Sequence, residues 1–189
     1  MELLQIENLR FRYPDSERYA LDGISVRIRA GEFVVVCGES GCGKTTLLKL
    51  LKRELAPFGE KSGSIRYNGT EQSALDARTA ACEIGYVLQN PESQVVTDKV
   101  WHELAFGLES LGLPTDEIRR RVSEMASYFG IGEWFRSDTD KLSGGQKQLL
   151  SLASVMVMQP KLLLLDEPTA QLDPIAAKEF IGTLQTLNR

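Results

Sequence analysis

Gly38-Glu39-Ser40-Gly41-Cys42-Gly43-Lys44-Thr45 matches the pattern G-x-x-x-x-G-K-[ST] at every fixed position. The continuous apolar run at residues 33–37 precedes it and predicts a strand buried on both faces. Residues 44–55 follow with helical periodicity in their leucines. A strand, a glycine-rich loop and a helix in this order indicate a phosphate-binding loop, because glycines let backbone N–H groups turn toward phosphate oxygens.

Two side chains of this loop carry predicted tasks. Lys44 is expected to reach the β- and γ-phosphates of a nucleotide, and Thr45 to offer its hydroxyl to Mg²⁺. The alternative is a glycine turn followed by a chance Lys-Thr pair. The predicted strand before the loop and the helix after it disfavour that alternative.

A second strand is predicted at residues 162–165, where four leucines are followed by Asp166 and Glu167. Ligands of α/β sheets bind at the carboxyl ends of strands. Asp166 therefore suits a Mg²⁺-holding role and Glu167 the polarisation of an attacking water. Alone the pair is weak evidence, since many strands end in an exposed Asp-Glu turn; together with the phosphate-binding loop it is strong.

Leu142-Ser143-Gly144-Gly145-Gln146 is a further glycine-rich start of a predicted helix, and so a second candidate anion site. One ATP does not need two such cradles far apart in sequence. We therefore expect this segment to serve the ATP of another subunit. The alternative is a helix capped by Ser143 with a flexible glycine pair.

The remaining pattern is of the α/β class. Residues 1–30, 64–67 and 84–88 are predicted as strands, and helices dominate from about 97 to 137, with Thr115 as an N-cap and Gly130 as a stop. Helices are also predicted at 144–158 and at 174–187, the last capped by Asp173. The simplest architecture is one domain with an α/β core, residues 1–92 and 141–189, and a helical lobe inserted at 93–140.

Composition limits the classes of function. The 189 residues are 42% apolar and 25% charged, as in ordinary globular domains. The net charge of −4 argues against a nucleic-acid partner, and no stretch has the length of a membrane-spanning helix. The sequence has an odd number of cysteines, Cys37, Cys42 and Cys82, which argues against a disulfide framework and fits a reducing cytosol. The apolar run around Cys37 predicts a core position for that residue.

The order of the motifs resembles the nucleotide-binding domain of ABC ATPases across nearly the whole chain. The matching features are the phosphate-binding loop, Gln89, residues 142–146, the Asp166-Glu167 pair and Asp173. The resemblance implies an α/β, RecA-like P-loop NTPase core with an N-terminal antiparallel β-subdomain and an inserted α-helical subdomain. It implies ATP and Mg²⁺ as ligands and ATP hydrolysis coupled to transport as the activity, with Lys44, Gln89 and Glu167 as catalytic residues.

The resemblance also implies roles around the nucleotide. Tyr13 matches the aromatic residue that stacks on adenine, and Thr46 a contact to the α-phosphate. Gln89 matches the glutamine that contacts Mg²⁺ and the water and senses the membrane partner; Thr45 and Asp166 are the other metal residues.

The resemblance further implies contacts across a pair of ATPase domains. The residues 143–146 match the segment that contacts the γ-phosphate of the opposite subunit, chiefly through Ser143 and Gly145. Asp173 matches the aspartate that links the two sites, in the mild variant Gln171-Leu172-Asp173.

A narrower resemblance lies in Gln89-Asn90-Pro91-Glu92-Ser93-Gln94 and in Glu103-Leu104-Ala105-Phe106-Gly107-Leu108-Glu109. Both are similar to the ATPases of energy-coupling factor (ECF) transporters, including cobalt-type importers, which take up vitamins or transition-metal ions. This implies an identical or paralogous ATPase partner, a transmembrane coupling protein and a substrate-binding membrane subunit. The implied location is cytoplasmic, on the inner face of the cell membrane. The alternative is that the segment only packs the helical lobe.

One departure from the family concerns its switch histidine, which in the family follows a further strand after the glutamate that Glu167 matches. The only histidine here is His102, in the predicted lobe, and the sequence ends at Arg189. The chain therefore looks C-terminally truncated, and we expect it to bind nucleotide better than it hydrolyses it.

Three other functions stay open to different degrees. A soluble ABC ATPase acting on DNA or ribosomes often has a coiled coil or a duplicated domain, and the chain has no heptad run and no basic patch. The ATPase of another ABC transporter class is the second alternative. A P-loop kinase or GTPase is the third, but it leaves residues 142–146 without a task.

Overall fold

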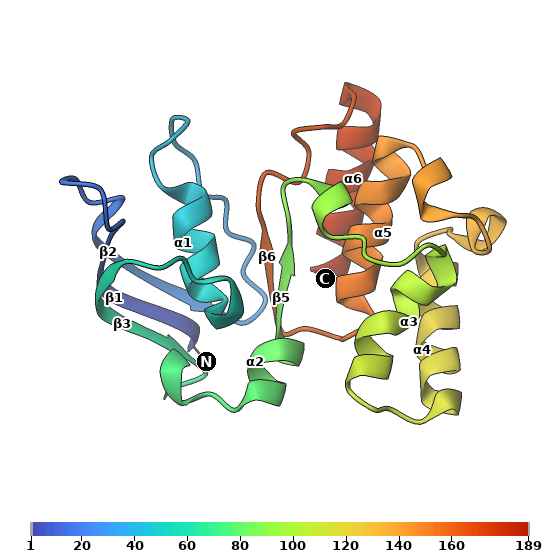
Figure 1. Cartoon of the computed structure of the whole chain (residues 1–189), viewed down its shortest axis with the longest axis horizontal. Helices are drawn as coiled ribbons and strands as arrows, with labels where there is room; N and C mark the ends of the chain where they lie inside the picture. Colours follow the sequence, from blue (N-terminus) through green and yellow to red (C-terminus); the bar gives the residue numbers. More distant parts are fainter. Residues whose placement is uncertain (1, 189) are drawn as a thin grey trace. The chain divides into compact units, whose positions relative to one another are not determined.

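A computed structural model describes residues 2–188 of the chain (Figure 1). The chain divides into two compact units, which we describe one at a time. The first runs to Ala81 and includes Asn188, and the second is Cys82–Leu187.

The first unit is built on an antiparallel sheet with the strand order β2-β1-β3-β4. Its strands are β1 (Glu2–Arg12), β2 (Leu21–Arg29), β3 (Glu60–Tyr67) and β4 (Thr70–Glu71). β1 pairs with β2 on one side and with β3 on the other. Alternate apolar side chains of β1, such as Leu4 and Ile6, are buried, as expected for a strand with one covered face. The predicted N-terminal antiparallel sheet is confirmed.

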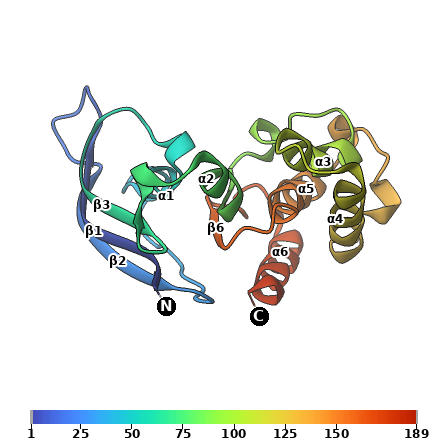
Figure 2. The same ribbon diagram turned by 90° about the horizontal axis from the view of Figure 1, so that it is seen from below.

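Helix α1 (Lys44–Leu51) lies along one face of this sheet and buries Leu50 and Leu51 (Figures 1 and 2). Short 3-10 helices follow at Arg53–Leu55 and Gln72–Ala74, and then α2 (Ala77–Glu83).

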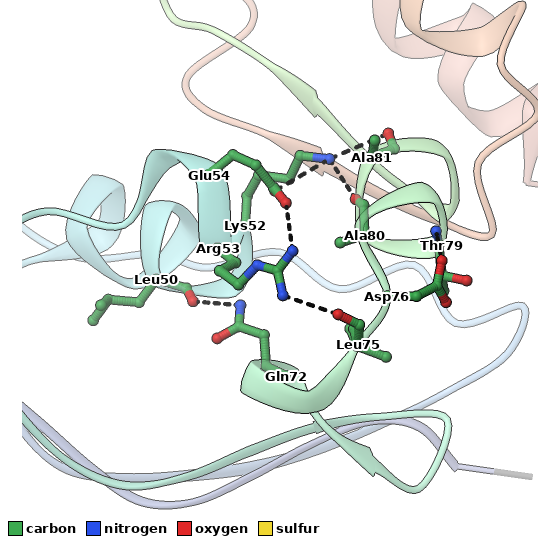
Figure 3. Close-up of polar contacts among 10 residues, drawn as sticks. All are labelled: Leu50, Lys52, Arg53, Glu54, Gln72, Leu75, Asp76, Thr79, Ala80 and Ala81. Atoms are coloured by element: carbon green, nitrogen blue, oxygen red, sulfur yellow. Dashed lines mark hydrogen bonds and ion pairs between the residues drawn. The ribbon is translucent and has the colours of Figure 1, made fainter. Parts of the chain in front are cut away.

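The C-terminal end of α1 is held by polar side chains (Figure 3). Lys52 Nζ donates to Ala80 O at 2.6 Å, which satisfies a carbonyl near the end of α2. The buried Gln72 donates to Leu50 O at 2.8 Å. These contacts fix α1 to the segment that leads into α2.

The second unit contains a parallel pair of strands, β5 (Ile84–Val87) and β6 (Leu162–Leu165), in the register Ile84↔Leu162. Its helices are α3 (Val100–Ser110), α4 (Thr115–Tyr128), α5 (Gly144–Met156) and α6 (Pro174–Leu187). Short 3-10 helices lie at Pro91–Ser93, Gly132–Trp134 and Thr139–Lys141. The core of this unit is formed by apolar residues of β5 and these four helices.

Most predicted elements of this unit are confirmed, with small shifts at their ends. Gly130 has a φ of +65° just after α4, which fits a helix stop. Thr115 was expected to cap α4, but it is the first helical residue. Pro114 stands at the N-cap, because its backbone is extended and helical conformation starts only after it. Within residues 2–188 no helix is both long and apolar enough to cross a bilayer.

The predicted buried strand at residues 33–37 is wrong for this structure. The segment has no strand conformation, and Val35 is 69% exposed. Cys37, expected in the core, is also exposed. A strand needs hydrogen bonds to a partner, and none of the strand ladders among residues 2–188 includes this run. The apolar composition of residues 33–37 favours burial, but composition alone does not provide a partner strand.

The predicted division into an α/β core and an inserted helical lobe stays a prediction. Residues 93–140 do contain α3 and α4, as expected for the lobe.

Candidate functional site

The phosphate-binding loop has the backbone that its glycines predict. Gly41 and Gly43 have φ values of +81° and +96°, in the left-handed region that favours glycine. A Cβ on Gly43 would also lie 2.4 Å from Ala20 O, so no other residue fits there without a shift. Helix α1 begins at Lys44, within the last two residues of the motif, and no side-chain hydrogen bond caps it. The predicted loop-to-helix passage is confirmed.

The Lys44 side chain folds back onto its own loop. Its Nζ donates to Gly38 O at 2.9 Å and to Glu39 O at 2.8 Å. The ammonium group therefore lies at the loop, where a phosphate would meet both its charge and the N-terminus of α1.

Tyr13 and Thr46 come together although 33 positions separate them in sequence. Tyr13 Oη and Thr46 Oγ1 share a hydrogen bond of 3.0 Å. Tyr13 is 40% exposed, and its ring packs edge-on against Phe11, with centroids 4.9 Å apart. One face of the first unit thus presents an aromatic ring next to the helix of the phosphate-binding loop, and the two residues expected at adenine and at the α-phosphate are neighbours.

Asp166 follows β6 and is almost completely buried, with 3% of its surface exposed. Its backbone N–H donates to Val87 O, which extends the parallel pairing by one residue. Its Oδ2 accepts a hydrogen bond of 3.1 Å from the hydroxyl of Tyr86. A carboxylate buried at the end of a strand needs such donors, because burial without them is costly.

Tyr86 was missed at the level of sequence. Burial raises the pKa of its phenol well above the ordinary value, and the negative charge of Asp166 raises it further. The available signal was a tyrosine in an apolar strand, because a buried hydroxyl needs a partner. Naming Asp166 as that partner required the register of β5 on β6.

Glu167 meets Gln89 at the ends of the two parallel strands. Gln89 Nε2 donates to Glu167 Oε2 at 2.7 Å. Glu167 has a φ of +43°, an uncommon left-handed conformation for a residue with a side chain. The structure thus brings together the glutamine and the glutamate that the family resemblance placed in one site.

The residues 143–146 start α5 with a capping box. Ser143 Oγ accepts from the Gln146 N–H at 3.3 Å, and Gln146 Oε1 accepts from the Ser143 N–H at 2.9 Å. The helix cap by Ser143, which was the alternative to an anion site, is therefore present. No feature of residues 2–188 requires glycine at positions 144 and 145. Neither residue has a positive φ. A Cβ on Gly144 would have no atom within 4 Å, and a Cβ on Gly145 would lie 3.8 Å from the Ala176 side chain.

Asp173 caps α6, as predicted. Its Oδ1 accepts from the N–H groups of Ile175 at 2.9 Å and Ala176 at 3.1 Å. This local task accounts for the residue type, and its expected role between two sites stays a prediction.

The predicted site residues therefore form two groups, one in each unit. The first unit holds Tyr13, Thr46 and the phosphate-binding loop; the second holds Gln89, Asp166, Glu167, the residues 143–146 and Asp173. The expected metal residues offer a hydroxyl, a carboxylate and an amide oxygen, and hard oxygen donors of this kind suit Mg²⁺. Among residues 2–188 no cluster of three or more His, Cys, Asp or Glu side chains could hold a metal.

Comparison with known proteins gives consistent matches. The ABC transporter family profile matches residues 21–170. A Bacillus thuringiensis subsp. konkukian protein, provisionally named an ABC transporter ATP-binding protein, is 54% identical over 97% of the chain. The match covers 33% of that protein, so the chain spans about a third of its length.

A cobalt import ATP-binding protein, CbiO of Syntrophus aciditrophicus, is 36% identical over 99% of the chain and 66% of its own length. The solved structure of CbiO1 from Clostridium perfringens, part of the ABC transporter complex CbiONQ, has a TM-score of 0.88 and 34% identity. It covers 99% of this chain and 74% of that one. The fold, the motifs and these matches agree: the chain belongs to the ABC transporter family, as an ABC ATPase domain.

Proposed function

We propose that the chain binds and hydrolyses ATP to drive an ECF-type importer of a vitamin or a transition-metal ion. The observation that carries the hydrolytic part is the contact of Gln89 with Glu167 beside the buried Asp166. Parallel strands end at one edge of a sheet, and ligands of such sheets bind there.

The residues have distinct tasks in this proposal. The phosphate-binding loop and Lys44 bind the phosphates, Tyr13 stacks on adenine, and Glu167 accepts a proton from the attacking water. Mg²⁺ when bound would neutralise developing charge on the β- and γ-phosphates, and Thr45, Asp166 and Gln89 are the residues that would hold it.

The hydrogen bond between Gln89 and Glu167 gives Gln89 a second task. Its amide donates to the carboxylate that would act as base, and so holds that carboxylate in one orientation. A water or a phosphate that competes for the Gln89 amide would release Glu167.

We further propose that two ATPase domains share each ATP. Glycine is a poor helix former, yet Gly144 and Gly145 occupy the first turn of α5, and no contact or positive φ among residues 2–188 requires glycine at either position. Close approach of an external group is the remaining reason for such glycines. The N-terminal end of α5, with no side chain on its first two residues to block a ligand, would suit the γ-phosphate bound to a partner domain.

The importer class rests on residues 89–94 and 103–109 and on the similarity to CbiO, whose name states cobalt import. In this proposal the chain lies at the inner face of the membrane and contacts a transmembrane coupling protein. The partner ATPase is a second copy or a paralogue, and the substrate is bound by a separate membrane subunit.

Isolation of the tagged protein from detergent-solubilised membranes tests the transporter assignment. The expected result is a stoichiometric complex with a membrane-spanning subunit. The Lys44→Ala variant should form this complex as stably as the wild type does. It should, however, no longer bind ATP. Recovery with ribosomes or DNA and without a membrane protein would instead favour the soluble class of ABC ATPases. Failure of the wild type to bind ATP would contradict the proposed function as a whole.

A further inference from the structure

Gln94 joins two segments that the proposed function gives separate tasks. Its Oε1 accepts a hydrogen bond of 2.8 Å from the N–H of Leu88, the residue before Gln89. Its Nε2 donates at 3.2 Å to the carbonyl of Ser151 in α5, the helix that begins next to Ser143. One amide therefore bridges the backbone beside the catalytic glutamine and the helix of the second anion site.

The loop between Leu88 and Gln94 is internally braced, so the bridge has a fixed base. The Asn90 side chain accepts from the Glu92 N–H at 3.0 Å. The N–H of Gln94 donates to Pro91 O at 3.0 Å. With its backbone held in this way, the two bonds of Gln94 cost mainly the rotamer entropy of its side chain.

Strand β5 and helix α5 also touch directly. A Cβ on Gly85 would lie 2.5 Å from Val155 Cγ1, so only glycine allows this approach. Apolar contact of this kind is non-directional. The two hydrogen bonds of Gln94 add the direction, since each fixes a particular backbone group of one segment.

A second tie lies further along the same segment. Glu103, 5% exposed, accepts from the N–H groups of Val96 and Thr97 at 3.1 and 2.9 Å. Thr139, which lies four residues before Ser143, donates from its Oγ1 to Thr97 O at 2.6 Å. The segment that follows Gln89 is thus held to both sides of the start of α5.

The outer contact of this region carries less weight. Lys147 Nζ lies 2.9 Å from Glu92 and holds the pKa of that carboxyl below its ordinary value. Glu92 is 67% exposed, and solvent screening makes such an ion pair a weak link. The partly buried amide of Gln94 is the stronger link.

We propose that Gln94 is a positioning residue that couples Gln89 to α5. When Gln89 is displaced by the ATP bound to its own domain, Gln94 moves the segment 143–146, which contacts the ATP bound to the partner domain. This inference rests on the proposed function, because it takes Gln89 and Ser143 as ATP contacts. It adds a residue to which no ATP contact is assigned and which acts only through its two backbone partners.

Two variants separate the two bonds. Gln94→Glu keeps the oxygen that accepts from Leu88 and loses the donor to Ser151, while Gln94→Leu loses both. Ser154→Ala is the matched control, because Ser154 Oγ donates to the same Ser151 carbonyl at 3.0 Å but does not reach the loop. Thermal unfolding of all three proteins shows which of them fold.

The test is amide hydrogen exchange of the whole chain with and without Mg·ATP, at concentrations where light scattering finds only monomer. In the wild type and in Ser154→Ala, ATP should slow exchange both at residues 88–90 and at 143–147. In Gln94→Glu the slowing should persist at 88–90 and be lost at 143–147. A wild-type response in Gln94→Glu overturns the proposal, and so does an equal loss in Ser154→Ala.

Steady-state hydrolysis gives an independent readout. A positioning role predicts that Gln94→Glu lowers kcat by about tenfold and leaves the KM for ATP nearly unchanged, because the lost bond acts after nucleotide has bound. A rise in KM without a fall in kcat would assign Gln94 to ATP binding instead and overturn the coupling. Wild-type protein that neither binds nor hydrolyses ATP would refute the proposed function, whereas normal wild-type activity with unchanged variants would refute only the role of Gln94.

Discussion

Gln89 donates a hydrogen bond of 2.7 Å to Glu167, 78 positions further along the chain, at the ends of two neighbouring parallel strands. Gln89 lies two residues after the end of β5, and Glu167 lies two residues after the end of β6. Their contact places the proposed base next to the proposed sensor of the membrane partner. Each of the two can therefore be tested by changing the other's hydrogen-bonding capacity.

The first prediction concerns Glu167→Gln. The amide keeps the size of the side chain and can still accept from Gln89, but it is a poor proton acceptor, so hydrolysis should fall by a factor of about 100 or more. ATP should stay bound and hold two copies together, as light scattering after gel filtration with Mg·ATP would show. Lys44→Ala in the same background should remain monomeric. An ATP-bound Glu167→Gln protein that stays monomeric at high concentration would contradict the shared site.

The second prediction separates the ring of Tyr13 from its hydroxyl. Tyr13→Phe loses the hydrogen bond to Thr46 and keeps the ring, whereas Tyr13→Ala loses both. If the ring stacks on adenine, Tyr13→Ala should weaken ATP binding by about 1–2 kcal/mol, and Tyr13→Phe by much less. Titration with a fluorescent ATP analogue measures both. Equal weakening in the two variants would show that the hydroxyl, and not stacking, matters.

The third prediction is a pH dependence of stability. The pKa of the Tyr86 phenol is raised in the folded protein by burial and by Asp166, so the folded state holds this proton more tightly than the unfolded state. The contribution to stability is complete below the ordinary phenol pKa of about 10 and is lost progressively as the pH rises above it. Urea unfolding at pH 8 and at pH 11 should show a smaller loss of stability in Tyr86→Phe than in the wild type. An equal loss in both proteins would contradict the assignment.

Local motifs were predictable from sequence where the residue type has a local reason. Gly43 is required by its φ of +96°, and Asp173 caps the helix that starts at the next residue. Such features depend on a few neighbouring residues, and the start of α1 at Lys44 and the cap of α6 follow from them.

Features that depend on distant partners were not predictable in the same way. The Tyr86–Asp166 bond joins residues 80 positions apart and needs the register of β5 on β6. The run at 33–37 shows the opposite failure, since its apolar residues indicated burial but no partner strand covers it among residues 2–188. Hydrophobic pattern reports the tendency of a segment, and pairing decides whether the tendency is realised.

The fourth prediction concerns the packing of β5 on α5. A methyl group at Gly85 would lie 2.5 Å from Val155 and 3.1 Å from Pro160, so Gly85→Ala should destabilise the protein by about 1–3 kcal/mol in urea unfolding. Val155→Ala in the same chain should recover part of the loss, because it removes the closer atom. Gly182→Ala is the control: it lies in α6 with nothing within 4 Å, and it should stabilise by up to about 1 kcal/mol. A neutral Gly85→Ala would show that the two elements can separate freely.

The last prediction separates the two tasks of Ser143, which caps α5 and is proposed to contact the γ-phosphate of a partner domain. Asp is as good an N-cap as Ser, so Ser143→Asp should keep the free energy of unfolding, whereas Ser143→Ala should lose about 1 kcal/mol. The carboxylate of Ser143→Asp would repel a γ-phosphate, so this variant should bind ATP normally through its own phosphate-binding loop and fail to pair. Unfolding curves and light scattering with Mg·ATP, in the Glu167→Gln background, measure the two effects separately. If Ser143→Asp forms ATP-bound dimers as readily as the protein with Ser143, the proposed contact with the γ-phosphate is contradicted and helix capping is the only task of this serine.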